Sequence, residues 1–140
     1  MRLVLATAIA TLSSGAIATP VGPEVVPDRF ISAWNTHDLK AFDALYTDDA
    51  VWVPVAEERT AGRAAIVAEF AKVHAGKGWA VRTTIVKKGE SEVHVLKRGI
   101  ATIFFHVNFL MDGKPVPGLE RAMILVAVRK PATGRSLPDN

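Results

Sequence analysis

The sequence predicts an α+β fold in which a curved antiparallel sheet packs against helices near the N-terminus. Residues 30–53 read as two short helices, a turn and a strand, whereas residues 79–129 read as strands joined by hairpin turns. Isolated helices of this length are only marginally stable in water, so these helices must share a core with the sheet. The chain has 140 residues, 49% of them hydrophobic, which is enough for one domain with a substantial core.

Apolar residues at helical spacing predict the first two helices. Phe30, Ala33 and Trp34 fall at positions i, i+3 and i+4, on one stripe of a helix. We expect this helix to begin near Pro27, because proline suits the first helical turn. Asp38 is a good N-cap for the second helix. That helix has its own apolar stripe of Leu39, Phe42, Leu45 and Tyr46.

The remaining elements follow from turn residues and alternating patterns. We expect a short strand at 50–53, a polar loop at 56–61 and a third helix at 62–75 with Ile66, Phe70 and Val73 on one face. The later strands are predicted at 79–88, 91–96, 100–111 and 119–129. The turns between them are predicted at Gly89-Glu90, Lys97-Arg98-Gly99 and Asp112-Gly113.

The two ends of the chain differ from its middle. Residues 1–18 have a basic start, an apolar run at 3–12 and an Ala-x-Ala site at Ala16-Ile17-Ala18, the pattern of a cleaved signal peptide. The alternative is a helix or strand buried in the fold. We expect residues 19–26 to form an arm, 27–130 the domain and 131–140 a disordered tail. The predicted location is therefore secreted or periplasmic.

Composition narrows the classes of partner and chemistry. The chain has no cysteine, which excludes disulfides and thiol nucleophiles, and its formal net charge is only +3. The basic pairs Lys87-Lys88, Lys97-Arg98 and Arg129-Lys130 lie where strands are predicted to end. No stacking aromatic residues are interleaved with them, so we expect no nucleic-acid partner. After signal cleavage we expect no membrane association.

Several short motifs carry a family resemblance. Four of them follow one another in order: Trp34-Asn35, His37-Asp38, the run from Thr47 to Trp52 and the segment Gly62-Arg63-Ala64-Ala65-Ile66. This pattern resembles the nuclear transport factor 2-like superfamily, and within it the SnoaL-like and SgcJ/EcaC groups. The resemblance implies a cone-shaped barrel, an apolar pocket for a small hydrophobic molecule, and homodimerisation. Members usually carry one further strand, which the sequence at 131–140 does not predict.

The strand predicted at 100–111 holds the candidate catalytic residues. Phe104, His106 and Asn108 share one face, because alternate residues of a strand point the same way. If this face points inward, His106 could serve as a general acid or base that Asn108 orients. The alternative is a face that meets solvent or a partner subunit.

Aromatic residues supply the candidate ligand-binding positions, because their rings offer large apolar area and, in Trp and Tyr, one polar donor. The alternative for each aromatic residue is ordinary core packing. Arg121 is a candidate for binding an anionic group, with a surface role as its alternative. The predicted ligand-binding residues are Phe30, Trp34, Tyr46, Trp52, Phe70, Phe104 and Arg121.

Other chemistries find little support in the sequence. By resemblance to the ketosteroid isomerases, their tyrosine donor falls on Phe30 and their catalytic aspartate on Val53, and neither side chain can transfer a proton. The acidic pairs Asp48-Asp49 and Glu57-Glu58 fit turns. The four histidines lack metal-ligand spacing, and no phosphate loop or dinucleotide motif occurs, so we expect no metal and no cofactor.

Two functional hypotheses follow from these observations. The first is an exported domain that binds a small hydrophobic molecule in an apolar pocket. The alternative is a cofactor-independent lyase or isomerase that uses His106 on a small hydrophobic substrate. The sequence favours binding, because the one catalytic template that could be tested lacks its functional residues.

Overall fold

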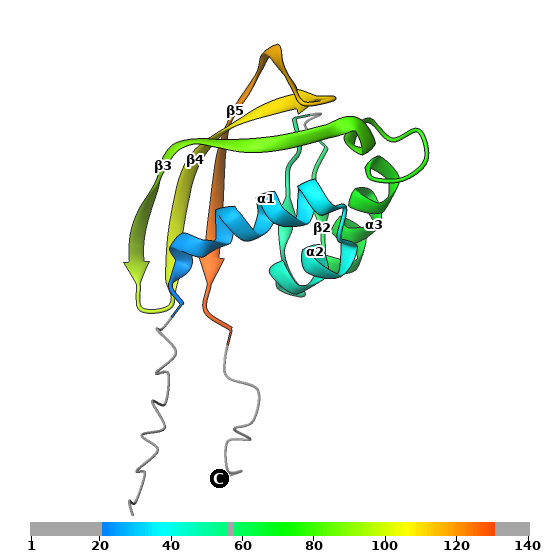
Figure 1. The fold of residues 1–140 in the computed structure, drawn as a ribbon. Helices are drawn as coiled ribbons and strands as arrows, with labels where there is room; N and C mark the ends of the chain where they lie inside the picture. The colour runs from blue at the N-terminus through cyan, green and yellow to red at the C-terminus, as the bar shows by residue number, and fades with distance from the viewer. Residues whose placement is uncertain (1–20, 56–57, 131–140) are drawn as a thin grey trace, which may run out of the picture.

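The fold is α+β, with helices covering one face of a curved antiparallel sheet (Figure 1). This computed structural model describes residues 21–55 and 58–130. The helical segments are η1 (Pro23–Val25), α1 (Val26–Thr36), α2 (Leu39–Leu45), α3 (Arg63–Val73) and η2 (Trp79–Arg82). The strands are β1 (Val51–Trp52), β2 (Thr60–Ala61), β3 (Thr83–Lys97), β4 (Ile100–Met111) and β5 (Lys114–Val128).

The main sheet has the order β3-β4-β5, and both strand pairs are antiparallel. In Figure 1, α1 runs along one face of this sheet, and α2 and α3 gather beside one end of it. Strands β1 and β2 form a separate antiparallel pair. This arrangement confirms the predicted fold class.

Several local predictions are confirmed. β4 covers 100–111 as predicted, and Asp112 and Gly113 form the tight turn after it, with φ values of 49° and 76°. Such turns need positive φ at both central residues, which favours Asp-Gly. The Asp38 carboxylate caps α2 by accepting hydrogen bonds from the backbone amides of Lys40 (3.0 Å) and Ala41 (3.1 Å).

The prediction of two separate strands at 79–88 and 91–96 is wrong. Residues 79–82 form η2, and β3 then runs without interruption from Thr83 to Lys97. The register with β4 shifts between Lys88 and Glu92, and Gly89 has a φ of +71°. A glycine at positive φ can make a bulge as easily as a turn, and this one bends the strand without reversing it. The pair Lys87-Lys88 therefore lies within β3, not at a strand end.

Two further boundaries differ from the predictions. β5 begins at Lys114 instead of 119, and its pairing with β4 is irregular between Asn108 and Leu110. The residues Pro115 and Gly118 in this stretch are typical of loops, which hides the start of the strand. The predicted polar loop at 56–61 ends in strand β2, which pairs with β1.

Buried residues of α1, α2 and α3 meet one face of β3 and β4. The buried apolar core consists of Phe30, Ala33, Trp34, Phe42, Ile66, Phe70, Ala80, Ile85, Ile103, Phe105 and Val107. Asn35 locks α1 against β3: its side-chain amide donates to the Ile85 carbonyl (2.9 Å) and accepts from the Ile85 amide (2.8 Å). This pair of bonds fixes where α1 crosses the sheet.

Some predictions fall on residues outside the described ranges. They are the signal peptide at 1–18, the beginning of the arm at 19–26, the disordered tail at 131–140 and the missing final strand. Among residues 21–55 and 58–130, no helix has the length and apolar character needed to cross a membrane.

Candidate functional site

The predicted catalytic residues His106 and Asn108 lie on the sheet face that points away from the helices. Ile103, Phe105 and Val107 of β4 are buried in the core, so alternation directs Phe104, His106 and Asn108 the other way. We call this surface of β3, β4 and β5 the outer face. Of the two orientations that the sequence leaves open for His106, the structure has the one that faces away from the core, and its catalytic role stays a prediction.

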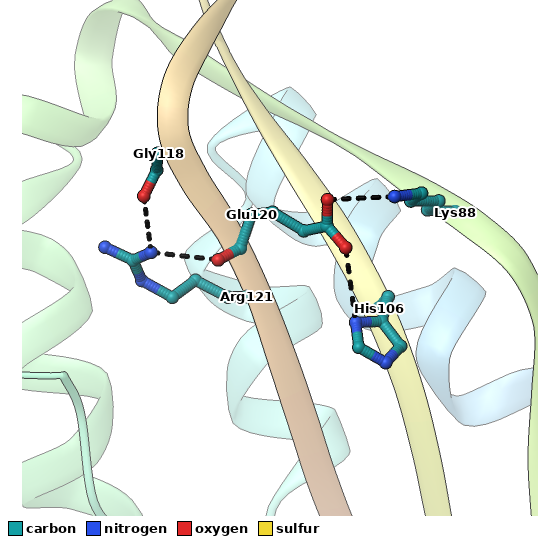
Figure 2. Close-up of polar contacts among 5 residues, drawn as sticks. All are labelled: Lys88, His106, Gly118, Glu120 and Arg121. Carbon is teal, nitrogen blue, oxygen red and sulfur yellow. Dashed lines mark hydrogen bonds and ion pairs between the residues drawn. The ribbon is translucent and has the colours of Figure 1, made fainter.

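The neighbours of His106 are charged and partly exposed (Figure 2). Its Nδ1 lies 3.6 Å from Oε1 of Glu120, and 41% of its side chain is exposed. The Lys88 ammonium donates to the other oxygen of Glu120 at 2.9 Å, and this bond holds the pKa of Glu120 below its usual range. Exposed ion pairs of this kind contribute little to stability.

Arg121 points away from this group and bonds to its own strand. Its Nη1 donates to the carbonyl oxygens of Gly118 and Glu120, each at 2.9 Å (Figure 2). These bonds support the irregular part of β5. A role for Arg121 in binding an anion stays a prediction.

The predicted ligand-binding aromatic residues divide into three groups. Phe30, Trp34 and Phe70 are buried, and Phe70 stacks on Phe42 with ring centroids 4.1 Å apart. Tyr46 and Trp52 are partly buried and pack against Phe70 at 6.1 and 4.9 Å. Burial raises the pKa of Tyr46 well above its ordinary value. Phe104 lies on the outer face, where its ring packs against that of His106 with centroids 5.1 Å apart.

Two surface hollows lie away from most of these residues. One of about 270 Å³ is open to solvent between α1 and α2, and its walls include Arg29, Thr36 and Leu45. A second of about 280 Å³ lies beside Tyr46 and Arg63. Tyr46 is the single predicted ligand-binding residue that lines either of these two hollows. Both are too open to enclose an apolar ligand.

A histidine pair joins the ends of two helices. His37 is the C-cap of α1 and His74 is the C-cap of α3, and their Nδ1 atoms lie 2.8 Å apart. One Nδ1 carries the hydrogen and donates it to the other. The backbone of His37 is in the left-handed conformation, with φ 55°, which is uncommon for residues other than glycine.

Aromatic rings surround His74 and lead from it to the surface. Trp34 lies edge-on to His74, with ring centroids 4.6 Å apart, and also contacts Trp79 (5.2 Å) and Phe109 (5.7 Å). Trp79 and Phe109 contact each other at 5.9 Å. Trp79 is 54% exposed, whereas His74 is 9% and Trp34 is 5% exposed. We call His37, His74, Trp34, Trp79 and Phe109 the histidine–aromatic cluster.

Two polar atoms of this cluster are buried without a hydrogen-bond partner among the described residues. They are Nε1 of Trp34 and Nε2 of His74. Leaving such a group unpaired costs roughly 1–3 kcal/mol, so it usually marks a strained or functional position. Burial, with a smaller contribution from nearby His37, lowers the pKa of His74 to about 4, so the ring is neutral at pH 7.

Of this cluster, the sequence analysis names only Trp34 as a site residue. His37 and His74 are 37 positions apart, and no local motif links them. The available signal is that each histidine lies where a predicted helix ends. Where one helix ends relative to another depends on packing, which spacing along the chain does not encode.

Metal binding finds no ready site in the part of the chain that the structure describes. No three side chains among its His, Asp and Glu residues lie close enough to hold an ion. The histidine pair alone offers two nitrogens, which a protein zinc site must supplement with further ligands.

Comparisons with solved structures support the fold. An uncharacterized cystatin-like-fold protein from Caulobacter vibrioides is similar at TM-score 0.65 and 21% identity, covering 76% of this chain and 75% of that one. A cystatin-like-fold domain of unknown function from Nostoc punctiforme has TM-score 0.68 and 14% identity, and the match covers 78% of this chain and 67% of that one. A putative polyketide cyclase from Pseudomonas putida has TM-score 0.45 and 19% identity, and the match covers 74% of this chain and 75% of that one.

At these identities the similarities to the Caulobacter and Nostoc structures establish the fold alone. A comparison with curated proteins gives no match. The family comparison is more decisive, because the SnoaL-like domain matches residues 28–136, which is most of the chain. The chain belongs to the SnoaL-like domain family.

Proposed function

We propose that this protein binds a small, mainly apolar molecule at the histidine–aromatic cluster. The observation that carries the proposal is the half-exposed Trp79, which packs against Trp34, in a cluster that holds two buried polar atoms without partners among the described residues. Rings at the surface supply apolar contact area, and the unpaired atoms supply fixed points for orientation. Nδ1 of His106 is also buried without a hydrogen-bond partner in the described part of the chain, but it lies on the outer face beside the Glu120 carboxylate, so the alternative enzyme reading is not favoured.

The experiment is a titration of ¹⁵N-labelled protein with p-xylene, followed by NMR. We expect the Trp79 and Trp34 indole signals and the Phe109 amide to shift together. Trp79→Ala should weaken binding, whereas Phe104→Ala on the outer face should not. Shifts confined to Phe104 and its outer-face neighbours would contradict the proposal.

Export is also part of the proposed function. It is supported by the basic start, the apolar run at 3–12 and the Ala-x-Ala site that ends at Ala18. Expression in a bacterial host should give a periplasmic or secreted product whose first residue is Thr19. Recovery of a product that still begins at Met1 would contradict export.

We further assign the chain to the SgcJ/EcaC group within its family. The motifs Asp48-Asp49-Ala50-Val51-Trp52 and Gly62-Arg63-Ala64-Ala65-Ile66 support that assignment. One of these motifs has a clear structural use, because Arg63 forms an ion pair with Asp48 at 2.6 Å and so ties α3 to the turn before β1.

We also propose a homodimer in which the outer faces of two copies pack together. Large apolar side chains on this face are exposed: Val86, Phe104, Ile124, Val126 and Val128. Lys88, Glu92 and Glu120 lie on the same face, so both signs of charge are available for pairing across a two-fold axis. The test of this dimer is given in the Discussion.

A further inference from the structure

We propose that His74, held by His37, and the indole of Trp34 together recognise one hydroxyl or carbonyl group on a neutral, planar ligand. This inference rests on the proposed function and makes it more specific, because it names the chemical group that the cluster selects. It assigns a role to the pair of His37 and His74, which no single sequence motif links.

The histidine pair leaves one nitrogen of His74 for a ligand. Its Nδ1 is already bonded to Nδ1 of His37 at 2.8 Å, so Nε2 is its remaining polar atom. The bond also fixes the orientation of the ring and links its tautomer to that of His37. When His37 donates, Nε2 of His74 carries a hydrogen and donates; when His37 accepts, Nε2 accepts.

The Trp34 indole adds a second, fixed requirement. Its Nε1–H can only donate, and it is buried without an acceptor among the described residues. The Trp34 and His74 rings are in contact, with centroids 4.6 Å apart, and from this contact we infer that one small polar group serves both nitrogen atoms. A hydroxyl accepts from Trp34 and either donates to or accepts from His74, whereas a carbonyl accepts from both.

The rest of the cluster defines the body of the ligand. Trp79 and Phe109 pack against Trp34 with ring centroids 5.2 and 5.7 Å away, and the half-exposed Trp79 ring favours a planar apolar partner. Because the buried His74 ring is neutral at pH 7, it presents no positive charge that would favour an anion. A phenol-like molecule meets all of these requirements.

The test compares p-cresol with p-xylene on the full chain. The two probes have nearly the same shape, and one has a hydroxyl where the other has a methyl group. We expect p-cresol to bind about tenfold more tightly, as one buried hydrogen bond provides. We also expect p-cresol to move the Trp34 indole N–H signal downfield, which p-xylene should not do.

Variants identify the atoms responsible. His74→Phe and Trp34→Phe should each remove most of the preference for p-cresol while p-xylene still binds. His37→Asn keeps a residue that tolerates the left-handed conformation and should reduce the preference without unfolding the chain. His106→Phe, on the outer face, is the control and should keep the full preference.

The outcomes separate this inference from the proposed function. Equal affinity of the wild-type chain for both probes would overturn the inference and leave apolar binding intact. A p-cresol preference that survives in both His74→Phe and His37→Asn would overturn it as well. Failure of both probes to bind would overturn the proposed function together with the inference.

Discussion

At the scale of single residues, the buried imidazole of His74 couples folding to pH. Its pKa is lowered from 6.5 to about 4, so between these values the unfolded chain binds more protons than the folded one. The contribution of the neutral His74 ring to the unfolding free energy is therefore fully present above about pH 6.5 and is lost as pH falls toward about 4. The shift corresponds to at most about 3 kcal/mol of unfolding free energy.

Urea unfolding at pH 7 and at pH 4.5 checks this prediction. The wild-type chain should lose more stability over this range than His74→Phe, whose side chain does not titrate. Asp112 and Glu120 also have lowered pKa values and contribute in both proteins, so the difference between the two proteins isolates His74. Parallel losses in both would contradict the prediction.

His106 contrasts with His74, although both lie beside aromatic rings. Its side chain is 41% exposed and its nearest charged partner, Glu120, is 3.6 Å away. We expect His106→Ala to change the unfolding free energy by less than about 0.5 kcal/mol, as is usual for exposed sites. Binding of p-xylene, measured by NMR titration, should also be unchanged. A large loss of binding would contradict this prediction and show that His106 takes part in ligand binding.

At the scale of elements, one side chain makes two hydrogen bonds that help to fix α1 on the sheet, beside the Asp28–Lys87 ion pair and the buried residues of α1. Asn35 makes two hydrogen bonds to the backbone of Ile85 and so acts as an extra pairing partner for β3. Asn35→Ala should lower the unfolding free energy by about 1–3 kcal/mol, because the Ile85 amide and carbonyl lose their partners.

The neighbouring Thr36 provides a matched control for this change. Its hydroxyl bonds only to Ser32 within the same helix and is exposed, so Thr36→Ala should have a much smaller effect in urea unfolding. Equal effects of the two changes would show that general loss of helix stability, and not the bond to β3, is responsible.

The elements also show which signals a sequence carries reliably. β4 is predicted at its observed ends, because the Gly99 and Asp112-Gly113 turns bound a continuous apolar run. The ends of β3 are not predicted correctly, because Gly89 permits both a turn and a bulge, and only pairing with β4 selects the bulge. The alternation in β4 separates its two faces correctly but does not tell which face the helices cover.

The candidate site was harder to predict than the fold for a related reason. Trp34 belongs to an apolar helical stripe, and the sequence marks it as a binding or core residue. Its partners His74 and Trp79 come from α3 and η2, and Phe109 comes from β4, so they meet only when those elements pack. Side chains that are brought together by packing leave no fixed spacing along the chain.

At the scale of the whole molecule, the outer face is a large surface without a cover among the described residues. The three strands hold 15, 12 and 15 residues, so alternation leaves about twenty side chains on this face. A stable protein interface uses roughly 20–30 residues on each side. The size of the face therefore suits a second copy of the chain, packed sheet against sheet.

The proposed dimer can be tested with two matched valines. Val126 lies on the outer face beside Thr102 and is 65% exposed, whereas Val55 lies in the loop after β1 and is 74% exposed. A lysine at position 126 would place a charge inside the interface, where burying it without a partner is costly. We expect Val126→Lys to be monomeric and Val55→Lys to remain dimeric in sedimentation-velocity measurements.

Thermal unfolding of the two variants provides the control, because both valines are exposed and neither change should disturb the monomer's core. The dimer should gain stability with protein concentration, so the wild-type melting temperature should rise on concentration while that of Val126→Lys should not. A wild-type chain that sediments as a monomer at every concentration would contradict the dimer. So would dimers in both variants, since they would place the interface elsewhere than on the outer face.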